Sequence, residues 1–450
     1  MRSMTRSLTM ATVILPTTLR NLAGGDAGHR IDGRTVGEVL AALEARHPRL
    51  AGWVLDERRR LRQHVSVFVG PRRAGLDDAV EPGDQVYVVQ AISGGAPDEA
   101  ELLAGTKKGL IVLRGERGAA LRPVHRAFPG QSVDYAVRDP RTGTYYAAIT
   151  HGQYGPHLYL TGDVTGDWQE AEGPAFPAGA DAAVSSIWVI TPGEEDGVLW
   201  AGVAPAALFE SRDGGRSWAL VEGLWNVPGR DAWEGGAGGL CLHSICPWPG
   251  DPSRLAVAIS AAGVWHTEDG GASWRRGGRG LVARYLPPEA RRGATMLCVH
   301  NMHRAPRQPA TLYMQFHGGV YRSDDDGASW IDVAGGLPSD FGFPLVVDPD
   351  DPDRAWVIPL NADEDRVTAG GRVRVYETRD RGASWQERST GLPQRDAYLT
   401  VLRQAFCHDG GQGLYFGTTS GEIFGSADGG RSWRSIARHL PPILALRSAR

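Results

Sequence analysis

Short apolar runs alternate with polar turns along most of the chain, and the alternation has a fixed period. The run at residues 319–321, for example, leads into a polar turn, and the turn leads into a segment that begins with tryptophan. The turn has the form Ser/Thr-x-Asp-x-Gly-x-x-Trp and occurs at residues 211–218, 267–274, 323–330, 378–385 and 426–433. Its tryptophans stand at 218, 274, 330, 385 and 433, so the repeating unit has 48 to 56 residues. The pattern predicts a β-hairpin around each turn, and a unit of this length suits one four-stranded blade of a β-propeller.

Two looser copies of the turn precede these five. Thr161, Asp163 and Trp168 keep their places while the glycine comes one position late, and residues 114–121 keep only the spacing and the glycine. We therefore predict seven units. The hydroxyl and carboxylate are expected to accept backbone N–H bonds, the glycine to give backbone freedom, and the tryptophan to fill the space between blades. The motif carboxylates are thus interpreted as structural: Asp163, Asp213, Asp269, Asp325, Asp380 and Asp428.

The repeated turn resembles the Asp box of the BNR-repeat propellers, a group that includes sialidases, sortilin-type receptors and photosystem assembly factors. The resemblance covers roughly residues 102–447. Segments at 105–109, 239–244, 316–323 and 337–344 further resemble a bacterial, cytosolic BNR family whose members are often labelled glycosyl hydrolase or exo-sialidase. The resemblance implies a WD40/YVTN/BNR-like propeller. Residues 102–112 have the character of second and third strands and residues 440–446 that of a first strand, so we expect the C-terminal strand to complete the first blade and remove exposed edges.

Residues 1–95 lack the repeated turn and have a different pattern. Residues 11–16 and 18–23 suggest a hairpin, and residues 35–46 predict a helix with Thr35 as its cap and Val36, Val39, Leu40 and Leu43 on one face. Residues 65–69 and 85–89 alternate as strands. This order of elements is typical of a ubiquitin-like β-grasp domain.

The end of this first module carries a second resemblance. Residues 83–95, Gly-Asp-Gln-Val-Tyr-Val-Val-Gln-Ala-Ile-Ser-Gly-Gly, are similar to the C-terminus of the MoaD/ThiS sulfur carriers. The resemblance implies an ATP-dependent activating enzyme that adenylates the terminal carboxylate and exchanges it for sulfur, with Gly94 and Gly95 fitting a narrow site because they lack Cβ atoms. Here Gly95 is followed by Ala96, so a processing protease must first expose the carboxylate, or the module no longer carries a group.

Composition and charge exclude several classes of function. The formal net charge is -4, divided as +3 over residues 1–95 and -7 over the rest, so neither part predicts nucleic-acid binding. No apolar run approaches the roughly 20 residues of a membrane span, and the first 20 residues lack a secretory pattern. The four cysteines form no C-x-x-C pair, which favours reduced thiols in a cytoplasmic protein. Residues 241–246 and 298–303 hold zinc-donor types, but strand alternation separates neighbouring donors, so we predict neither a metal nor a cofactor.

Lysine is almost absent from the chain. It has 46 Arg and two adjacent lysines, Lys107 and Lys108. An amine, unlike a guanidinium, can act as a base or accept an acyl group, although chance retention in a solvated turn explains the pair equally well. The corresponding loops of other units carry further polar residues, so we predict a pocket for a small-molecule or peptide ligand at the channel mouth. Its candidate catalytic residues are Lys108, His151, His317 and Glu364. Its other predicted lining residues are Lys107, Tyr154, Trp225, Trp233, His243, Ser260, His300, Asp363 and Thr418.

The sequence thus predicts a mainly β protein. We expect a β-grasp sulfur-carrier-like domain over residues 1–95, a linker over 96–101 and a seven-bladed propeller over 102–450, closed by its C-terminal strand. The favoured function is a carrier whose Gly94-Gly95 end is activated after cleavage, fused to a propeller that acts as a binding platform. The alternative is a glycoside-hydrolase-like enzyme that uses the mouth pocket. The Arg-Ile-Pro signature of sialidases is missing, which counts against sialidase chemistry.

Overall fold

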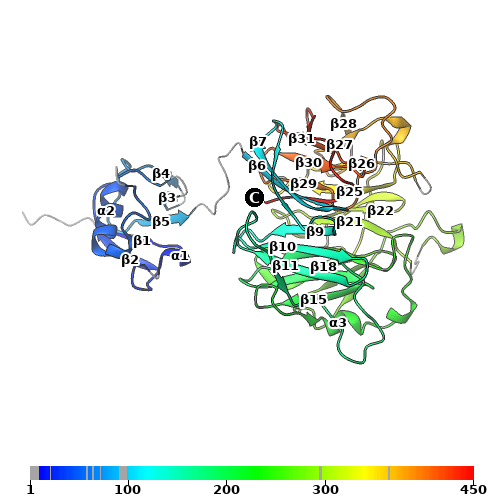
Figure 1. Ribbon diagram of the computed structural model, residues 1–450, viewed down its shortest axis with the longest axis horizontal. Coiled ribbons are helices and arrows are strands. Elements are labelled where there is room, and N and C mark those ends of the chain that lie inside the picture. The colour runs from blue at the N-terminus through cyan, green and yellow to red at the C-terminus, as the bar shows by residue number, and fades with distance from the viewer. Residues whose placement is uncertain are drawn as a thin grey trace, which may run out of the picture. The chain divides into compact units, whose positions relative to one another are not determined.

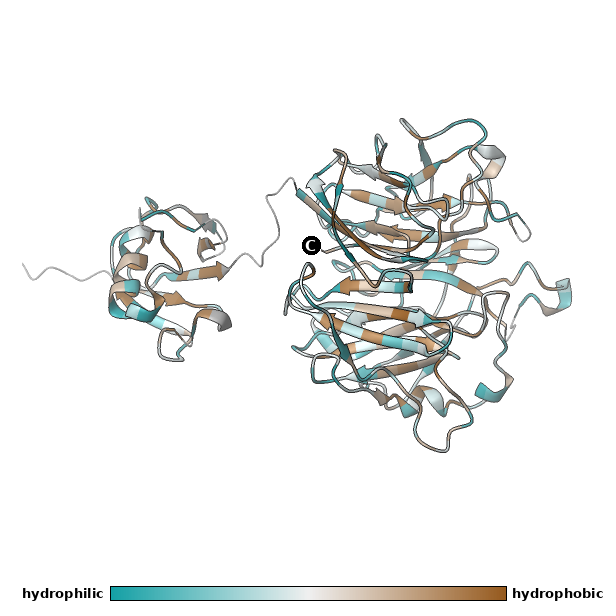
Figure 2. Cartoon of the chain, viewed as in Figure 1, coloured by the Kyte–Doolittle hydropathy of each residue, from teal (hydrophilic) through white to brown (hydrophobic). Residues whose placement is uncertain are grey.

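The chain forms two compact units, Met1–Gly94 and Gly95–Arg450 (Figure 1). The computed structural model describes residues 10–20, 22–56, 59–62, 65–70, 72–90, 99–292, 296–362 and 365–449. Apolar residues gather on the strands of each unit, and hydrophilic residues are frequent in the connecting loops (Figure 2). No helix within these described ranges is long and apolar enough to cross a membrane.

The smaller unit is a five-stranded sheet in the order β2-β1-β5-β3-β4. β1 is antiparallel to β2 and parallel to β5, and β3 is antiparallel to both β5 and β4. The strands are β1 (Met10–Ile14), β2 (Gly28–Asp32), β3 (Val65–Val69), β4 (Arg72–Ala74) and β5 (Gln85–Gln90). The described helical segments of this unit are the short α1 (Thr17–Arg20), the longer α2 (Val36–Arg46) and a 3-10 turn at Pro48–Leu50. This arrangement is the ubiquitin-like β-grasp fold that the sequence predicts.

Helix α2 confirms the predicted helix and its cap. The Thr35 hydroxyl accepts the Glu38 backbone N–H at 3.3 Å and satisfies one of the free donors of the first turn. The predicted apolar face is the buried one: Val36, Val39, Leu40 and Leu43 are all 0% exposed. They pack into a core with the buried residues of β1 and β5.

The predicted first hairpin is wrong in its second strand. Residues 17–20 form a short helix, α1 (Thr17–Arg20), and the strand that pairs with β1 begins only at Gly28. Pro16 fixes its own φ, and its carbonyl accepts the Leu19 N–H at 2.9 Å, which starts a helical turn. Gly24 and Gly25, with φ of +92° and +97°, then turn the chain back into β2.

The larger unit consists, within the described residues, of seven four-stranded sheets. Six of them use consecutive strands, and the seventh has the order β33-β6-β7-β8, so the C-terminal strand pairs with the first strand of the unit. The strands of the first four consecutive sheets are β9 (Ser132–Arg138), β10 (Tyr145–His151), β11 (Gly155–Thr161), β12 (Gln169–Ala171), β13 (Ser186–Pro192), β14 (Leu199–Ala204), β15 (Ala207–Ser211), β16 (Ala219–Leu220), β17 (Leu242–Trp248), β18 (Asp251–Ile259), β19 (Gly263–Thr267), β20 (Arg275–Gly277), β21 (Val299–Arg304), β22 (Leu312–Phe316), β23 (Gly319–Ser323) and β24 (Ile331–Asp332).

The remaining strands of this unit are β25 (Gly342–Val347), β26 (Ala355–Pro359), β27 (Val375–Thr378), β28 (Gln386–Arg388), β29 (Phe406–His408), β30 (Leu414–Gly417), β31 (Ile423–Ser426), β32 (Arg434–Ala437), β33 (Ile443–Ser448), β6 (Glu99–Thr106), β7 (Gly109–Glu116) and β8 (Arg122–Ala127). Its helical turns are α3 (Glu222–Trp225) and 3-10 turns at Arg230–Ala232, Pro288–Ala290 and Ala369–Gly371.

The first strands of the seven sheets lie next to one another. β9, β13, β17, β21, β25 and β29 contact in sequence order, and β33 contacts both β29 and β9. A cavity of about 450 Å³ is lined by residues from every one of these strands, among them Tyr135, Val189, Phe406 and Arg447. The arrangement is consistent with a β-propeller around a central channel.

The repeated turns hold themselves together and dock on the neighbouring sheet. In the turn at residues 323–330, Asp325 accepts the Ser329 N–H and hydroxyl, and the Ser323 hydroxyl accepts the Gly327 N–H. Trp330 is 4% exposed and packs with apolar residues of two adjacent sheets, while its backbone N–H donates to the Arg279 carbonyl of the preceding sheet. The equivalent hydrogen bonds to serine recur at Asp213, Asp269, Asp380 and Asp428, whereas Asp163, in the looser copy, accepts from Thr165.

Candidate functional site

The first candidate site is the tail of the smaller unit. β5 lies at the centre of the sheet, between β1 and β3, and runs to Gln90. Residues 91–98 follow it directly, so Gly94 and Gly95 lie outside the described residues. In sequence, the tail therefore follows the central strand of the sheet.

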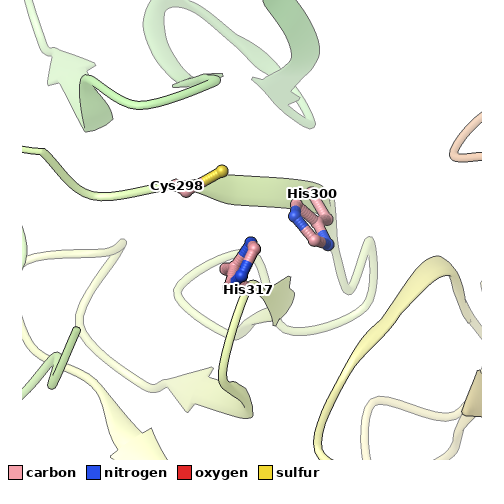
Figure 3. Close-up of side chains that lie close together, drawn as sticks. All are labelled: Cys298, His300 and His317. Carbon is pink, nitrogen blue, oxygen red and sulfur yellow. The ribbon is translucent and has the colours of Figure 1, made fainter. Parts of the chain in front are cut away.

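The second candidate site is a pocket of about 320 Å³ in the larger unit, lined by residues from separate strands and loops. Cys298 immediately precedes β21, His300 lies within it, and His317 immediately follows β22. The pairing of β21 with β22 shifts register between Val299 and Asn301, so a β-bulge at His300 sets the direction of its side chain. The pairing of β21 with β22 brings His317 close to Cys298. Val299 pairs with Phe316, and the His317 N–H donates to the Cys298 carbonyl at 3.0 Å. One donor atom from each side chain lies within 4.8 Å of the others (Figure 3).

Tyr285 positions two members of this cluster. Its hydroxyl accepts the Cys298 N–H and donates to the Met296 carbonyl, both at 2.8 Å. Its ring packs edge-on against the His317 ring, with centroids 4.6 Å apart. The loop before β21 is thus fixed by a side chain that also limits where His317 can turn. Burial raises the pKa of the Tyr285 hydroxyl, which therefore stays protonated.

Burial also sets the protonation of the cluster itself. His300 is 2% exposed and its Nδ1 lies 2.6 Å from the Gly342 carbonyl oxygen. A carbonyl only accepts, so Nδ1 carries the proton and Nε2 keeps its lone pair. Burial lowers the pKa of His300 well below its ordinary value, so the ring is neutral. Burial raises the pKa of the Cys298 thiol, against the opposing effect of Arg403.

Arg403 adds positive charge to the same pocket. Its guanidinium lies over the ring faces of Trp188 and Phe343, at 5.6 and 5.1 Å from their centroids. Its Nε is buried and has no hydrogen-bond partner among the described residues. Burial lowers the pKa of Arg403, and Arg366, which also lines the pocket, lowers it further. The pocket therefore combines a thiol, two imidazoles and two guanidiniums.

The predicted lysines lie elsewhere. Lys107 lines a neighbouring cavity of about 240 Å³ together with Asp134, Trp188 and Arg403, so Arg403 borders both cavities. Burial raises the pKa of Asp134, whose carboxylate accepts from the Ser132 and Thr150 hydroxyls. Lys108 is exposed in the turn between β6 and β7, and neither cavity includes it among its described lining residues.

The other predicted residues divide into those near the pocket and those with local roles. Ser260 lines the pocket, 3.9 Å from the Cys298 sulfur. His151 accepts the backbone N–H groups of Gln153 and Tyr154 and packs on the exposed Tyr154 ring. Trp225 and Trp233 both pack on the Arg230 guanidinium. A functional convergence of Lys108, His151, His317 and Glu364 stays a prediction, because Asp363 and Glu364 lie outside the described residues.

His243 and Thr418 are held by local hydrogen bonds. His243 is fully buried, its Nε2 lies 3.0 Å from the Val299 carbonyl oxygen, and burial lowers its pKa to about 3. The Thr418 hydroxyl accepts the Glu422 N–H within a tight turn. Sequence reasoning found His300, His317 and Ser260 but missed Tyr285, Arg366 and Arg403 as partners of that pocket. With 46 Arg in the chain, no local signal separates these two arginines from the rest.

Comparison with known proteins finds sequence relatives of the smaller unit. The model of the ThiS family matches residues 13–95. The sulfur carrier protein CysO of Mycobacterium tuberculosis is 31% identical over 90 residues, which are 19% of this chain and 97% of CysO. Among solved structures, a chain of the Amycolatopsis orientalis BexX/CysO complex is 30% identical, with 19% of this chain and 99% of that chain covered and a TM-score of 0.18. An ancestral GH74 enzyme is 17% identical over 76% of this chain, with a TM-score of 0.48.

These matches differ in what they cover. The chain spans only 40% of the length of the GH74 enzyme, at low identity. The match to CysO, in contrast, covers 97% of that protein. Through residues 13–95, the chain belongs to the ThiS family, and this part of it is a sulfur-carrier-type domain.

Proposed function

We propose that the β-grasp unit carries sulfur, or an activated acyl group, on the carboxyl end of Gly95, after cleavage of the chain at that residue. The observation that carries the proposal is where the family match ends: it stops at Gly95, directly after Gly94. A plain linker needs only flexibility, and any mixture of small and polar residues provides it. A paired glycine at this one position has a more specific use, because an activating site can close around a backbone without Cβ atoms.

The chemistry has three steps, each of which another protein performs on the tail. Water hydrolyses the peptide bond between Gly95 and Ala96 and frees a carboxylate. The carboxylate then attacks the α-phosphorus of ATP and releases pyrophosphate, which leaves an acyl adenylate. A sulfide donor attacks the acyl carbon and releases AMP, so the product is a thiocarboxylate. Pro97 disfavours helix at Ala96 and supports an extended, cleavable segment.

We propose that the larger unit is a seven-bladed propeller closed by β33. The sequence assigns residues 96–101 to a linker, but residues 99–101 belong to β6 and pair with residues 114–116 of β7, so the propeller begins before residue 102. The seven four-stranded sheets, the pairing of β33 with β6 and the cavity lined by all seven first strands support this architecture. Its role is to bind a small-molecule or peptide ligand and so act as a platform beside the carrier. The two cavities that share Arg403 support that role, because concave sites with a few placed polar groups are typical of ligand binding.

The partners follow from the chemistry. The carrier needs an ATP-dependent activating enzyme and a processing protease, and a CysO protein is known in complex with BexX. The proposal places these events in the cytoplasm. The free, buried state of all four cysteines, Cys241, Cys246, Cys298 and Cys407, supports a reducing compartment.

Intact-mass spectrometry of the protein recovered from its own cells tests the proposal. We expect a fragment that ends at Gly95, together with a form heavier by one oxygen-to-sulfur exchange. Incubation of the cleaved protein with an activating enzyme, ATP and a sulfide donor should increase the heavier form. Gly95→Ala should prevent it.

Gly75→Ala is the matched control in the same unit. A Cβ at Gly75 meets no atom within 4 Å, and its φ does not lie in the left-handed region, so the fold should accept the change. Recovery of full-length protein alone from native cells, with no adenylation of protein cleaved after Gly95, would show that the module keeps the fold of a carrier without its chemistry.

A further inference from the structure

The cluster of Cys298, His300 and His317 offers the donor types that zinc prefers, thiolate sulfur and imidazole nitrogen. It comes from the ends of two neighbouring strands, β21 and β22, whose pairing shifts register at a β-bulge between Val299 and Asn301. Zinc binds sulfur at about 2.3 Å and nitrogen at about 2.0 to 2.1 Å, which puts two donors on one ion roughly 3.3 to 3.8 Å apart. The three donor atoms lie within 4.8 Å of one another, so they must move closer together to bind one ion (Figure 3).

The second observation concerns the tautomer of His300. Histidine ligands in metal sites usually donate the N–H of their other ring nitrogen to a carbonyl or carboxylate, which fixes the ring and its tautomer. His300 has this arrangement, because Nδ1 donates to the Gly342 carbonyl and Nε2 retains its lone pair. A purely structural histidine in the same chain differs: His243 has contacts on both ring nitrogens, at Ser244 and Val299.

The third observation is the pocket. Three protein ligands leave one position of a tetrahedral ion for water or another ligand, and here the three donors line a cavity of about 320 Å³. Arg366 and Arg403 line the same cavity, and its described lining residues include no carboxylate. The positive charge of the ion and of the buried Arg403 guanidinium favours a negatively charged ligand at the fourth position.

We propose that the Cys298 sulfur, Nε2 of His300 and a ring nitrogen of His317 bind one zinc ion, whose fourth position faces the pocket and takes a small anionic ligand. Tyr285 is a positioning residue for this site, because it holds the Cys298 backbone and packs on His317. Arg403, with its buried and unpartnered Nε, is the residue that recognises the anion. The inference does not depend on the carrier chemistry of the smaller unit.

Metal analysis of the full chain tests the site. Purified protein, stripped with a chelator and reloaded with zinc, should retain one ion per chain after dialysis. Loading with cobalt instead should give the charge-transfer band of a thiolate ligand and the visible bands of a tetrahedral ion. Cys298→Ser and His317→Gln should each weaken metal binding more than about tenfold, and Cys298→Ser should also remove the charge-transfer band.

Cys407→Ser and His303→Gln are the matched controls. Cys407 is buried and His303 is half-buried, both in the same unit, and both line the central cavity instead of this pocket. They should leave zinc content and the cobalt spectrum unchanged. Circular dichroism and thermal unfolding of each metal-free variant show whether it has folded. They therefore distinguish the loss of a metal ligand from a failure to fold. If Cys298→Ser fails to fold, His317→Gln, whose side chain is less buried, carries the test.

A separate measurement tests the proposed anionic ligand at the fourth position of the ion. Acetate and inorganic phosphate are added separately to the cobalt-loaded protein, and at least one of them should shift the visible bands. Arg403→Gln should keep the cobalt and weaken that shift more than about tenfold. Wild-type protein that retains no more zinc than Cys298→Ser would overturn the metal site. A cobalt spectrum that neither anion changes would overturn the assignment of the fourth ligand.

Discussion

The two units hold their candidate chemistry in opposite ways. In the β-grasp unit it resides in a tail that follows β5, where the useful property is a backbone without side chains. In the larger unit it resides in side chains that only the fold brings together, since Arg403 lies 86 residues after His317 along the chain. A tail can be handed to another protein while its own domain stays folded. A convergent pocket exists only while the sheets around it are packed. Damage to packing should therefore abolish the second kind of site and leave the first intact.

The largest expected effect on this comparison comes from Trp330→Ala. Trp330 is 4% exposed and packs between adjacent sheets, so its removal should destabilise the larger unit by about 3 to 5 kcal/mol. Chemical denaturation with separate spectroscopic probes for the two units measures this. The unfolding transition of the β-grasp unit should not move.

Ile331→Ala is the control for that change. Ile331 is the next residue and is 54% exposed, so its truncation should alter stability by no more than about 0.5 kcal/mol. A loss below about 1 kcal/mol for Trp330→Ala, or an equal shift in both units, would contradict the role given to this tryptophan.

Gly95→Ala should have the converse effect, because it removes chemistry without removing stability. A Cβ that displaces the tail carboxylate by about 1 Å in an activating site should slow adenylation about a hundredfold. Both unfolding transitions should stay where they are in the wild-type protein. The measurement is the rate of pyrophosphate release by the activating enzyme with the cleaved carrier as substrate, and Gly75→Ala should release pyrophosphate at the wild-type rate.

The same contrast explains how much of each unit could be predicted from the sequence. Helix α2, its Thr35 cap and its buried face were predictable, because they depend on residues three or four positions apart. The repeated turns were predictable because each Asp and Ser hydrogen bonds within its own eight residues. The short helix α1 was missed, since residues 18–23 are apolar enough for a strand and only the Pro16 turn decides otherwise.

The pocket was predictable only in part. His300 and His317 stood out as histidines at the ends of apolar runs, but the register that joins them is a property of the sheet. Arg403 comes more than 80 residues after His317 and carries no local mark among 46 arginines. Its place beside Cys298 depends on how consecutive sheets pack, and no short window of sequence contains that information.

Thr35→Ala, a change in the β-grasp unit, also tests whether the two units unfold independently. Its expected effect on stability is smaller than that of Trp330→Ala. The Thr35 hydroxyl accepts the Glu38 N–H, and its loss should destabilise the β-grasp unit by about 1 kcal/mol. The transition of the larger unit should not change. Thr35→Ser, which keeps an accepting hydroxyl, should restore most of the lost stability. An equal shift in both units would mean that the two do not unfold separately.

The smallest expected effect is a dependence on acid pH that belongs to the larger unit. Hydrogen bonds from the Ser217 hydroxyl and N–H lower the pKa of Asp213 from 3.8 to about 2. A carboxyl group whose pKa is lower in the folded state stabilises that state above its unfolded pKa, and the contribution is lost as pH falls through the folded value. The stability of the larger unit should thus decline between about pH 4 and pH 2, and Asp213→Asn should make that decline shallower. Asparagine still accepts the backbone N–H but has no charge to titrate, so the difference between the two proteins isolates this one carboxylate from the other acids. Urea midpoints at a series of pH values measure it. A decline of equal slope in both proteins would show that the serine contacts of the turn do not hold the Asp213 charge, and that the repeated turns owe their stability to glycine and tryptophan instead.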